Sequence, residues 1–285
     1  MMNQSHLEAN QTIAEPHKIW VEPQPEPAIY KHQPLNSSSD EIRLLKLRKS
    51  NEGPLCCEIQ IFPLRQAPEY IALSYRWGPP SPLHDIFVGD QRLKIRDILN
   101  SCLLELREDV DAWLWIDQMC IAQADTTERN HQVGMMSRIY SNATSVIIWL
   151  SDDLDAGSII VLLNNIYFTR LWIVQEILLA KSVRIYLNGK RCVAWKKLQN
   201  EYSTMLKLVG LGTMPRAIFG LMNYTRKRWG SKPQLAWTRC ISNFSANACG
   251  DARDKVYAMM GIVDEEDRLT VDYNKSVLEV FLDVV

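Results

Sequence analysis

The chain has 285 residues, of which 47% are hydrophobic and 23% charged, and its formal net charge is −1. A chain of this length buries roughly three quarters of its unfolded surface, so its core needs neither disulfides nor a metal. The near-neutral charge disfavours nucleic acid and acidic lipid as main partners, and the apolar runs are too short to span a bilayer.

The cysteines give no sign of a metal site. Cys56 and Cys57 are adjacent, the other five are scattered, and no CxxC pair occurs, so zinc is not expected. No basic stretch followed by an apolar one opens the chain, so no signal peptide is predicted. We therefore expect a reduced cytoplasmic protein with neither a metal nor a resident cofactor.

Residues 1–39 are predicted to form a disordered, proline-rich arm. The segment is polar and ends in a run of asparagine and serines; its prolines are Pro16, Pro23, Pro25, Pro27 and Pro34. It offers too little apolar surface to offset the entropy lost on ordering. The ordered part of the chain is expected to begin at residue 40.

Two hairpins and one strand are predicted next. Residues 42–47 and 55–62 flank a turn at residues 50–54, and residues 84–95 turn at Gly89-Asp90. Between the hairpins, residues 70–75 form a strand that ends at Arg76, Trp77 and a Gly-Pro-Pro sequence. Because Gly-Pro-Pro breaks regular structure, Arg76 and Trp77 are placed on a loop at the strand's carboxyl end.

Residues 113–150 are the most informative stretch. One apolar run, Trp113–Ile116, stops at Asp117, and a second, Val146–Leu150, stops at an acidic loop over residues 151–155. A helix is predicted between them from Thr126, and another helix from Asp97 leads into the first run. This pattern predicts two βαβ crossovers with strands buried on both faces. Ligands of such sheets bind beyond the carboxyl ends of the strands, which places residues 117–123 and 151–155 at a candidate site.

The remaining chain is mostly helical. A helix over residues 166–181, a strand over 183–187 and an Asn188-Gly189 turn are followed by helices over 195–209, 215–228, 234–244, 254–262 and 276–285. The last helix reaches Val285 without a cap, as in a truncated chain. We predict an α/β fold with a mainly parallel, flavodoxin-like sheet. Residues 40–192 form the domain and residues 193–285 its helical extension.

Five blocks together resemble the fungal heterokaryon-incompatibility (HET) domain. In chain order they are Tyr70–Gly78, Leu114–Gln123, Glu128–Leu150, Arg170–Glu176 and Arg253–Gly261. The resemblance extends from residue 42 to the C-terminus. It departs from the family pattern at Ala122, where an asparagine is usual, and at Ser151, where a glycine is usual. The resemblance implies non-self recognition and induced cell death, with like domains and a recognition protein as partners.

The HET family is in turn similar to TIR domains, which are flavodoxin-like signalling modules, some of which cleave NAD. On that comparison Leu73–Tyr75 and Trp115–Asp117 resemble the first two TIR strands. Trp172 precedes Glu176 by four, as in TIR domains that use this glutamate as the catalytic residue. The resemblance implies that Glu176 is catalytic, that NAD is its substrate, and that the nucleotide site contains Ser74, Tyr75, Arg76, Trp77, Asp117 and Trp172.

Glu176 and Trp77 also have structural interpretations. Glu176 lies in a mostly apolar helix, so it either faces a cleft or pairs with a cation, Arg170 or Arg129. At a cleft, its carboxylate would stabilise the positive charge that develops on the ribose during cleavage. Arg76 could bind a phosphate and Trp77 could stack on a flat ring. Trp77 could equally be a core residue that packs beneath its loop.

Asp117 could orient a ribose hydroxyl or hold its loop by bonding to backbone amides, and the loop role is preferred because aspartate favours turns. Asp125-Thr126-Thr127-Glu128 resembles a capping box, so Asp125 and Glu128 are both expected to cap the helix that begins near Thr126. Cys120 and His131 suggest a thiol enzyme as a distant alternative. The preferred interpretation is that Cys120 is a buried and inert thiol.

Two leading hypotheses remain. The first is an NAD-cleaving enzyme activated by self-association, and the second is a non-catalytic, TIR-like signalling and interaction module. A TIR-like fold hosts both kinds of function. The departures at Ala122 and Ser151 favour the second.

Overall fold

The computed structural model describes residues 26–284, with gaps at 51, 151–158, 188–190, 210–217, 219, 223 and 226–233. The predicted acidic loop and the Asn188-Gly189 turn lie outside the described residues, as does most of the predicted helix 215–228. No helix in the described ranges is both long and apolar enough to cross a membrane.

Within the described residues, the strands form one nine-stranded sheet of order β5-β4-β2-β1-β6-β3-β7-β8-β9. Its four central strands run parallel to one another: β6 (Trp113–Trp115), β3 (Tyr70–Ser74), β7 (Ser145–Trp149) and β8 (Val183–Leu187). The predicted hairpins are present as β1 (Glu41–Leu47) with β2 (Cys56–Pro63) and β4 (Leu83–Val88) with β5 (Gln91–Arg96). With β9 (Arg191–Ala194) antiparallel to β8, the whole sheet is mixed. Among the described strands outside its parallel centre, only β2 and β4 pair in parallel.

The central strand order confirms the predicted α/β class and matches the flavodoxin arrangement. Numbered along the chain, β3, β6, β7 and β8 lie in the order 2-1-3-4. The chain passes from β3 to β6 on one side and then returns across β3 to β7. Such a reversal leaves a crevice beyond the carboxyl ends of the strands, where open α/β sheets bind ligands.

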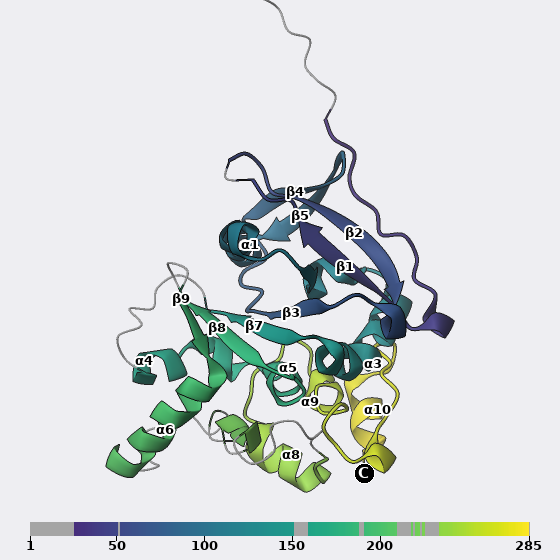
Figure 1. The fold of residues 1–285 in the computed structure, drawn as a ribbon. Coiled ribbons are helices and arrows are strands. Elements are labelled where there is room, and N and C mark those ends of the chain that lie inside the picture. The colour runs from purple at the N-terminus through teal and green to yellow at the C-terminus, as the bar shows by residue number, and fades with distance from the viewer. Residues whose placement is uncertain are drawn as a thin grey trace, which may run out of the picture.

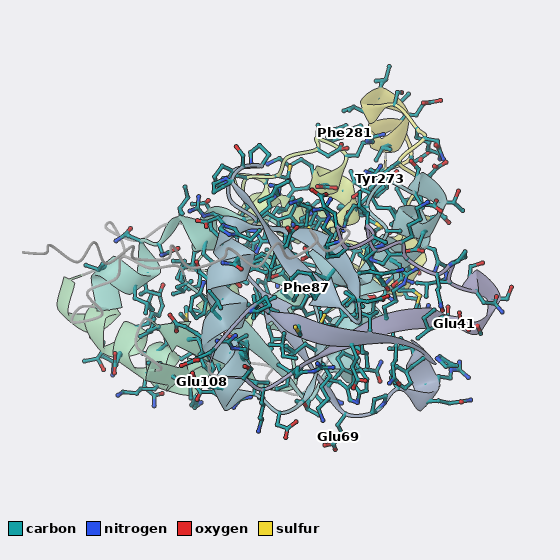
Figure 2. All side chains as sticks on the ribbon, turned by 90° about the horizontal axis from the view of Figure 1, so that it is seen from above. Glu41, Glu69, Phe87, Glu108, Tyr273 and Phe281 are labelled. Atoms are coloured by element: carbon teal, nitrogen blue, oxygen red, sulfur yellow. The ribbon has the colours of Figure 1, made fainter. Side chains whose placement is uncertain are left out.

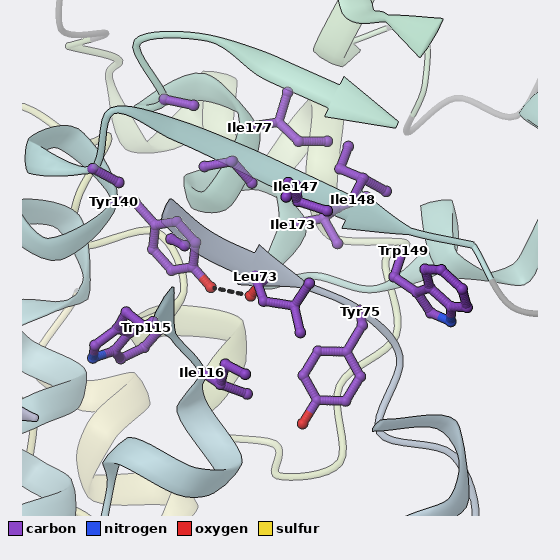
Figure 3. Packing of buried hydrophobic residues seen from close by; sticks show 14 of the residues in the cluster. Leu73, Tyr75, Trp115, Ile116, Tyr140, Ile147, Ile148, Trp149, Ile173 and Ile177 are labelled. Carbon is purple, nitrogen blue, oxygen red and sulfur yellow. Dashed lines mark hydrogen bonds between the residues drawn. The ribbon is translucent and has the colours of Figure 1, made fainter. Parts of the chain in front are cut away.

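Helices cover both faces of the parallel centre. Figure 1 shows α1 (Asp97–Asp109) on one side and α3 (Thr126–Asn142) and α5 (Ile173–Leu178) on the other. Every residue of β3 and β7 is buried, as expected for strands covered on both faces. Trp115 and Tyr140 meet edge to face, and the Tyr140 hydroxyl donates to the Leu73 carbonyl (Figure 3).

The helix predicted over residues 166–181 is wrong as a single element. A 3-10 turn at Ile166–Thr169 and α5 replace it, because Arg170 between them is extended. The Leu171 amide donates to the Ala248 carbonyl at 2.8 Å, and an isolated bridge joins Arg170 to Ala248. This pairing with a distant segment interrupts the helix and directs the start of α5 toward the C-terminal region.

The other helices with described bounds are short, except α6 with 15 residues. They are α2 (Asp117–Cys120), α4 (Ile159–Leu163), α6 (Trp195–Val209), α8 (Trp237–Phe244), α9 (Asp254–Tyr257) and α10 (Val277–Leu282). The helices expected over 254–262 and 276–285 are therefore shorter than predicted. Ser276 closes a capping box with Glu279 at the start of α10.

The described part of the predicted N-terminal arm contacts the folded domain. Ile29 bridges Arg92 of β5, and the ring of His32 lies 2.7 Å from the Met119 carbonyl oxygen. Burial lowers the pKa of His32. Residues 26–39 thus run across the sheet and reach the loop after β6.

Candidate functional site

A cavity of about 560 Å³ lies beyond the carboxyl ends of β3 and β6. Its walls are the loops after these strands, one side of α3, the start of α5, residues 248–254 and Tyr273. Seen from above, Tyr273 lies with the C-terminal segment, at the end of the molecule away from Glu108 (Figure 2). The volume falls within the range of roughly 300–1,000 Å³ that is usual for small-molecule sites.

The structure brings the predicted site residues together. Five of the seven line the cavity: Arg76, Trp77, Asp117, Trp172 and Glu176. The other two lie behind it, where the Ser74 hydroxyl donates to Glu176 and the Tyr75 hydroxyl donates to Gln118. The loops predicted at the ends of two separate strands therefore form one site.

The loop after β3 fixes Arg76 and Trp77 at the cavity. Gly78 has φ +70°, and a Cβ atom there would lie 2.6 Å from the Ile98 side chain, so the turn requires glycine. The Trp77 indole donates to an Asp117 carboxylate oxygen at 2.7 Å, and the Arg96 guanidinium lies 5.0 Å from the Trp77 ring centre. Trp77 both packs against the core and lines the cavity.

Asp117 holds the loop after β6, as its turn position predicts. Its second carboxylate oxygen accepts a hydrogen bond from the Gln118 amide at 2.7 Å, and its carbonyl accepts one from the Gln123 side chain at 2.8 Å. Burial raises the pKa of the Asp117 carboxyl. The indole of Trp77 and the amide of Gln118 satisfy both of its oxygens.

Glu176 is buried, with 2% of its side chain exposed, yet it lies at the cavity wall. Its two oxygens accept from Ser74 and from Arg170, whose guanidinium nitrogen is 3.5 Å away. Burial raises the pKa of the carboxyl, and the Arg170 guanidinium opposes this by favouring the charged form. The predicted ion pair and the predicted cleft position are therefore both present.

Two further residues complete the site and were missed. The Trp172 indole donates to Asp254 at 3.0 Å, and the Tyr273 hydroxyl donates to the other Asp254 oxygen at 2.5 Å. Asp254 belongs to the block 253–261, and its place in that block was its only sequence signal. Tyr273 carried no signal, because only the tertiary fold brings it to α3.

Residues 70–161 match the family model described as Heterokaryon incompatibility protein (HET). This region is therefore similar to the HET family. The chain is 37% identical over 137 residues to Heterokaryon incompatibility protein 6, OR allele, of Neurospora crassa, a match that covers 42% of this chain and 20% of the relative. It is 26% identical over 140 residues to Vegetative incompatibility protein HET-E-1 of Podospora anserina, covering 45% of this chain and 10% of that relative.

The chain thus covers only a fifth and a tenth of the lengths of these two curated relatives. No solved structure matches it. The HET match contributes the loops after β3 and β6 and the α3 wall, whereas Arg170, Trp172, Glu176 and Asp254 lie beyond its end at residue 161. The cavity is therefore built jointly by the HET match and the sequence that follows it.

The thiol of Cys120 in the HET region lies in a poor environment for catalysis. Cys120 is fully buried, and burial raises its pKa to about 12. Its sulfur accepts a hydrogen bond from the Ile116 amide, while His131 faces Asp40 at 3.7 Å. A thiol held neutral is a weak nucleophile, so the geometry favours the inert-thiol interpretation.

Replacing Asp254 by asparagine is expected to make stability less dependent on pH. Burial raises the Asp254 pKa above its ordinary value of 3.8, so the folded state binds more protons than the unfolded state above that pH. Stability is then lost as the pH rises through the raised pKa. Urea unfolding between pH 4 and pH 7 should show wild type losing stability relative to Asp254→Asn. A constant difference between the two proteins would contradict this assignment.

Proposed function

We propose that this chain is a fungal heterokaryon-incompatibility domain that acts in the cytoplasm by cleaving NAD after self-association. The similarity to two incompatibility proteins supports the incompatibility role. The observation that carries the enzymatic part is the position of Glu176, a buried carboxylate at the wall of a nucleotide-sized cavity. Like domains and a non-self-recognition protein are its proposed partners.

Cleavage would break the bond between nicotinamide and C1′ of the ribose. The bonding electrons leave with nicotinamide, positive charge develops on the ribose, and water adds to C1′ and releases a proton. Glu176 would stabilise that positive charge across the sugar face. Ser74 and Arg170 hold its carboxylate in place. The products are nicotinamide and ADP-ribose, so NAD is a substrate and no resident cofactor is needed.

The aromatic side chains at the cavity suit a dinucleotide. Trp77 and Trp172 line it from the loop after β3 and the start of α5, and each indole nitrogen is held by a carboxylate. An aromatic ring whose edge is fixed in this way offers its face to a flat heterocycle at little entropic cost. Arg76, on the same loop as Trp77, would meet a phosphate.

The ion pair at Glu176 also suits the second candidate, a non-catalytic TIR-like signalling module. Glu176 already has Arg170 as its charge partner, so its burial is explained without a substrate. Such a module would recruit like domains and a recognition protein through its surface, and Glu176 would serve only stability.

NAD consumption and cell death separate the two candidates. Wild type, Glu176→Gln and Glu58→Gln would be assayed for NAD loss at high, crowded protein concentration, and expressed in a filamentous fungus to score cell death. Glu58 is an exposed residue of β2 and provides the matched control. The enzyme hypothesis expects NAD loss and death for wild type and Glu58→Gln, and neither for Glu176→Gln. Cell death retained by Glu176→Gln without NAD loss would establish the signalling module instead.

A further inference from the structure

The Arg129 guanidinium faces the cavity without a hydrogen-bond acceptor. It projects from the second turn of α3 and stacks on the Tyr273 ring, with its central carbon 4.4 Å from the ring centre. Its Nε atom is buried and has no hydrogen-bond partner. No described residue accepts a hydrogen bond from the guanidinium or forms an ion pair with it. The Arg253 guanidinium also contacts this ring, with its central carbon 5.2 Å from the ring centre. Stacking therefore fixes Arg129 in place while leaving its donors unused.

Arg76 reaches the same cavity from the loop after β3, and it too has no acceptor among the described residues. By contrast, the acidic side chains of the cavity already have partners. Glu176 accepts from Ser74 and Arg170, and Asp117 accepts from Trp77 and Gln118.

The two remaining acids are occupied as well. Asp254 accepts from Trp172 and Tyr273, and Asp251 holds the Arg253 guanidinium at 2.6 and 2.9 Å. Within the described cavity wall, Arg76 and Arg129 therefore have no hydrogen-bonded carboxylate. Arg253 is the main group that lowers the pKa of Asp251, and the Arg129 charge contributes to the same shift.

We infer that Arg76 and Arg129 form an anion subsite of this cavity, and that it takes a pyrophosphate group. A buried guanidinium nitrogen without an acceptor costs free energy that an incoming oxyanion recovers. The planar fork of arginine matches phosphate oxygens with two parallel hydrogen bonds. Two forks from separate elements suit two linked phosphates. That the natural occupant is the pyrophosphate of NAD rests on the proposed function. That Arg76 and Arg129 bind a pyrophosphate group does not.

Calorimetric titration with inorganic pyrophosphate tests the subsite. Wild-type protein is expected to bind pyrophosphate. Arg129→Gln and Arg76→Gln should each raise the dissociation constant about tenfold or more. Arg138→Gln is the matched control, since Arg138 lies on α3 outside the cavity and pairs with Asp40. Arg138→Gln should bind pyrophosphate as wild type does.

Arg129→Gln also removes the stacking on Tyr273, so its folding needs a separate check. Arg76 loses no hydrogen-bond partner among the described residues, and a measurement on wild type avoids substitution altogether. Phenylglyoxal modification mapped by mass spectrometry should show that pyrophosphate protects Arg76 and Arg129 but not Arg138. No binding by wild type, or unchanged binding by folded Arg76→Gln and Arg129→Gln, would overturn the subsite.

Pyrophosphate binding and NAD cleavage fail in distinguishable ways. Binding that depends on the two arginines, without any NAD loss, would support the subsite and reject the enzyme. NAD loss that depends on Glu176 but proceeds unchanged in Arg76→Gln and Arg129→Gln, without pyrophosphate binding, would support the enzyme and reject the subsite.

Discussion

Replacing Arg43 by methionine is expected to lower the free energy of unfolding by about 3–5 kcal/mol, because it leaves a buried carboxylate unpaired. Arg43 is fully buried, and both of its terminal nitrogens donate to Glu128, at 2.6 and 2.9 Å. It also donates to the Cys120 carbonyl at 2.9 Å and to the Gln33 carbonyl. One side chain thus joins β1, the loop after β6, the start of α3 and the N-terminal segment. Urea unfolding followed by circular dichroism measures the loss.

The exposed pair of Arg138 with Asp40 gives the control for Arg43. Arg138→Met should cost no more than about 1 kcal/mol, since exposed ion pairs contribute little. The double variant Arg43→Met with Glu128→Leu should recover much of the loss, because it removes the buried charge with its partner. Equal losses for Arg43→Met and Arg138→Met would contradict the role of the buried pair.

Replacing Gly261 by alanine is expected to destabilise the fold by about 1–3 kcal/mol through overpacking. A Cβ atom at Gly261 would lie 2.2 Å from the Gln175 side-chain oxygen and 2.5 Å from the Ser137 Cβ atom. Neither neighbour can move easily. Gln175 is buried on α5 and donates to the Tyr257 carbonyl, and the Ser137 Cβ atom is fixed by α3. The melting temperature should fall accordingly.

Gly134 is the matched control for Gly261. It lies on the exposed side of α3, and a Cβ atom there would meet nothing within 4 Å. Gly134→Ala should therefore stabilise the protein by about 0.5–1 kcal/mol, since alanine favours helix over glycine. A Gly261→Ala protein as stable as wild type would mean that α3 and α5 are not packed tightly around this glycine.

Features encoded in local patterns were predicted well. The apolar runs Trp113–Ile116 and Val146–Leu150 correspond to β6 and β7. The strand β3 ends at Ser74, and Arg76 and Trp77 follow it on the loop that leads into Gly-Pro-Pro, as predicted. Because parallel strands end at the same edge of the sheet, these predicted loops had to lie close together. The cavity wall made by Arg76, Trp77 and Asp117 follows from this.

Features set by long-range contacts were not predicted. Asp125 caps α3 as the capping-box pattern predicts. Glu128, which was expected to cap the helix with it, instead pairs with Arg43 and accepts the Ala122 amide at 2.7 Å. The helix through Glu176 is broken because Arg170 pairs with Ala248.

Tyr273 at the cavity wall is another residue that the sequence did not predict. Tyr273 reaches it because its amide donates to Asn130 of α3 at 2.9 Å. Contacts between residues so far apart in sequence leave no periodic trace in the chain, so Tyr273 could not be placed at the site from its neighbours.

The most direct test of NAD cleavage at Glu176 is proton NMR of NAD incubated with concentrated protein. Wild type is predicted to produce free nicotinamide and ADP-ribose in equal amounts, and folded Glu176→Gln to produce them at least about a hundredfold more slowly. Intact NAD after incubation with assembled wild-type protein, or equal rates for the two proteins, would contradict the account.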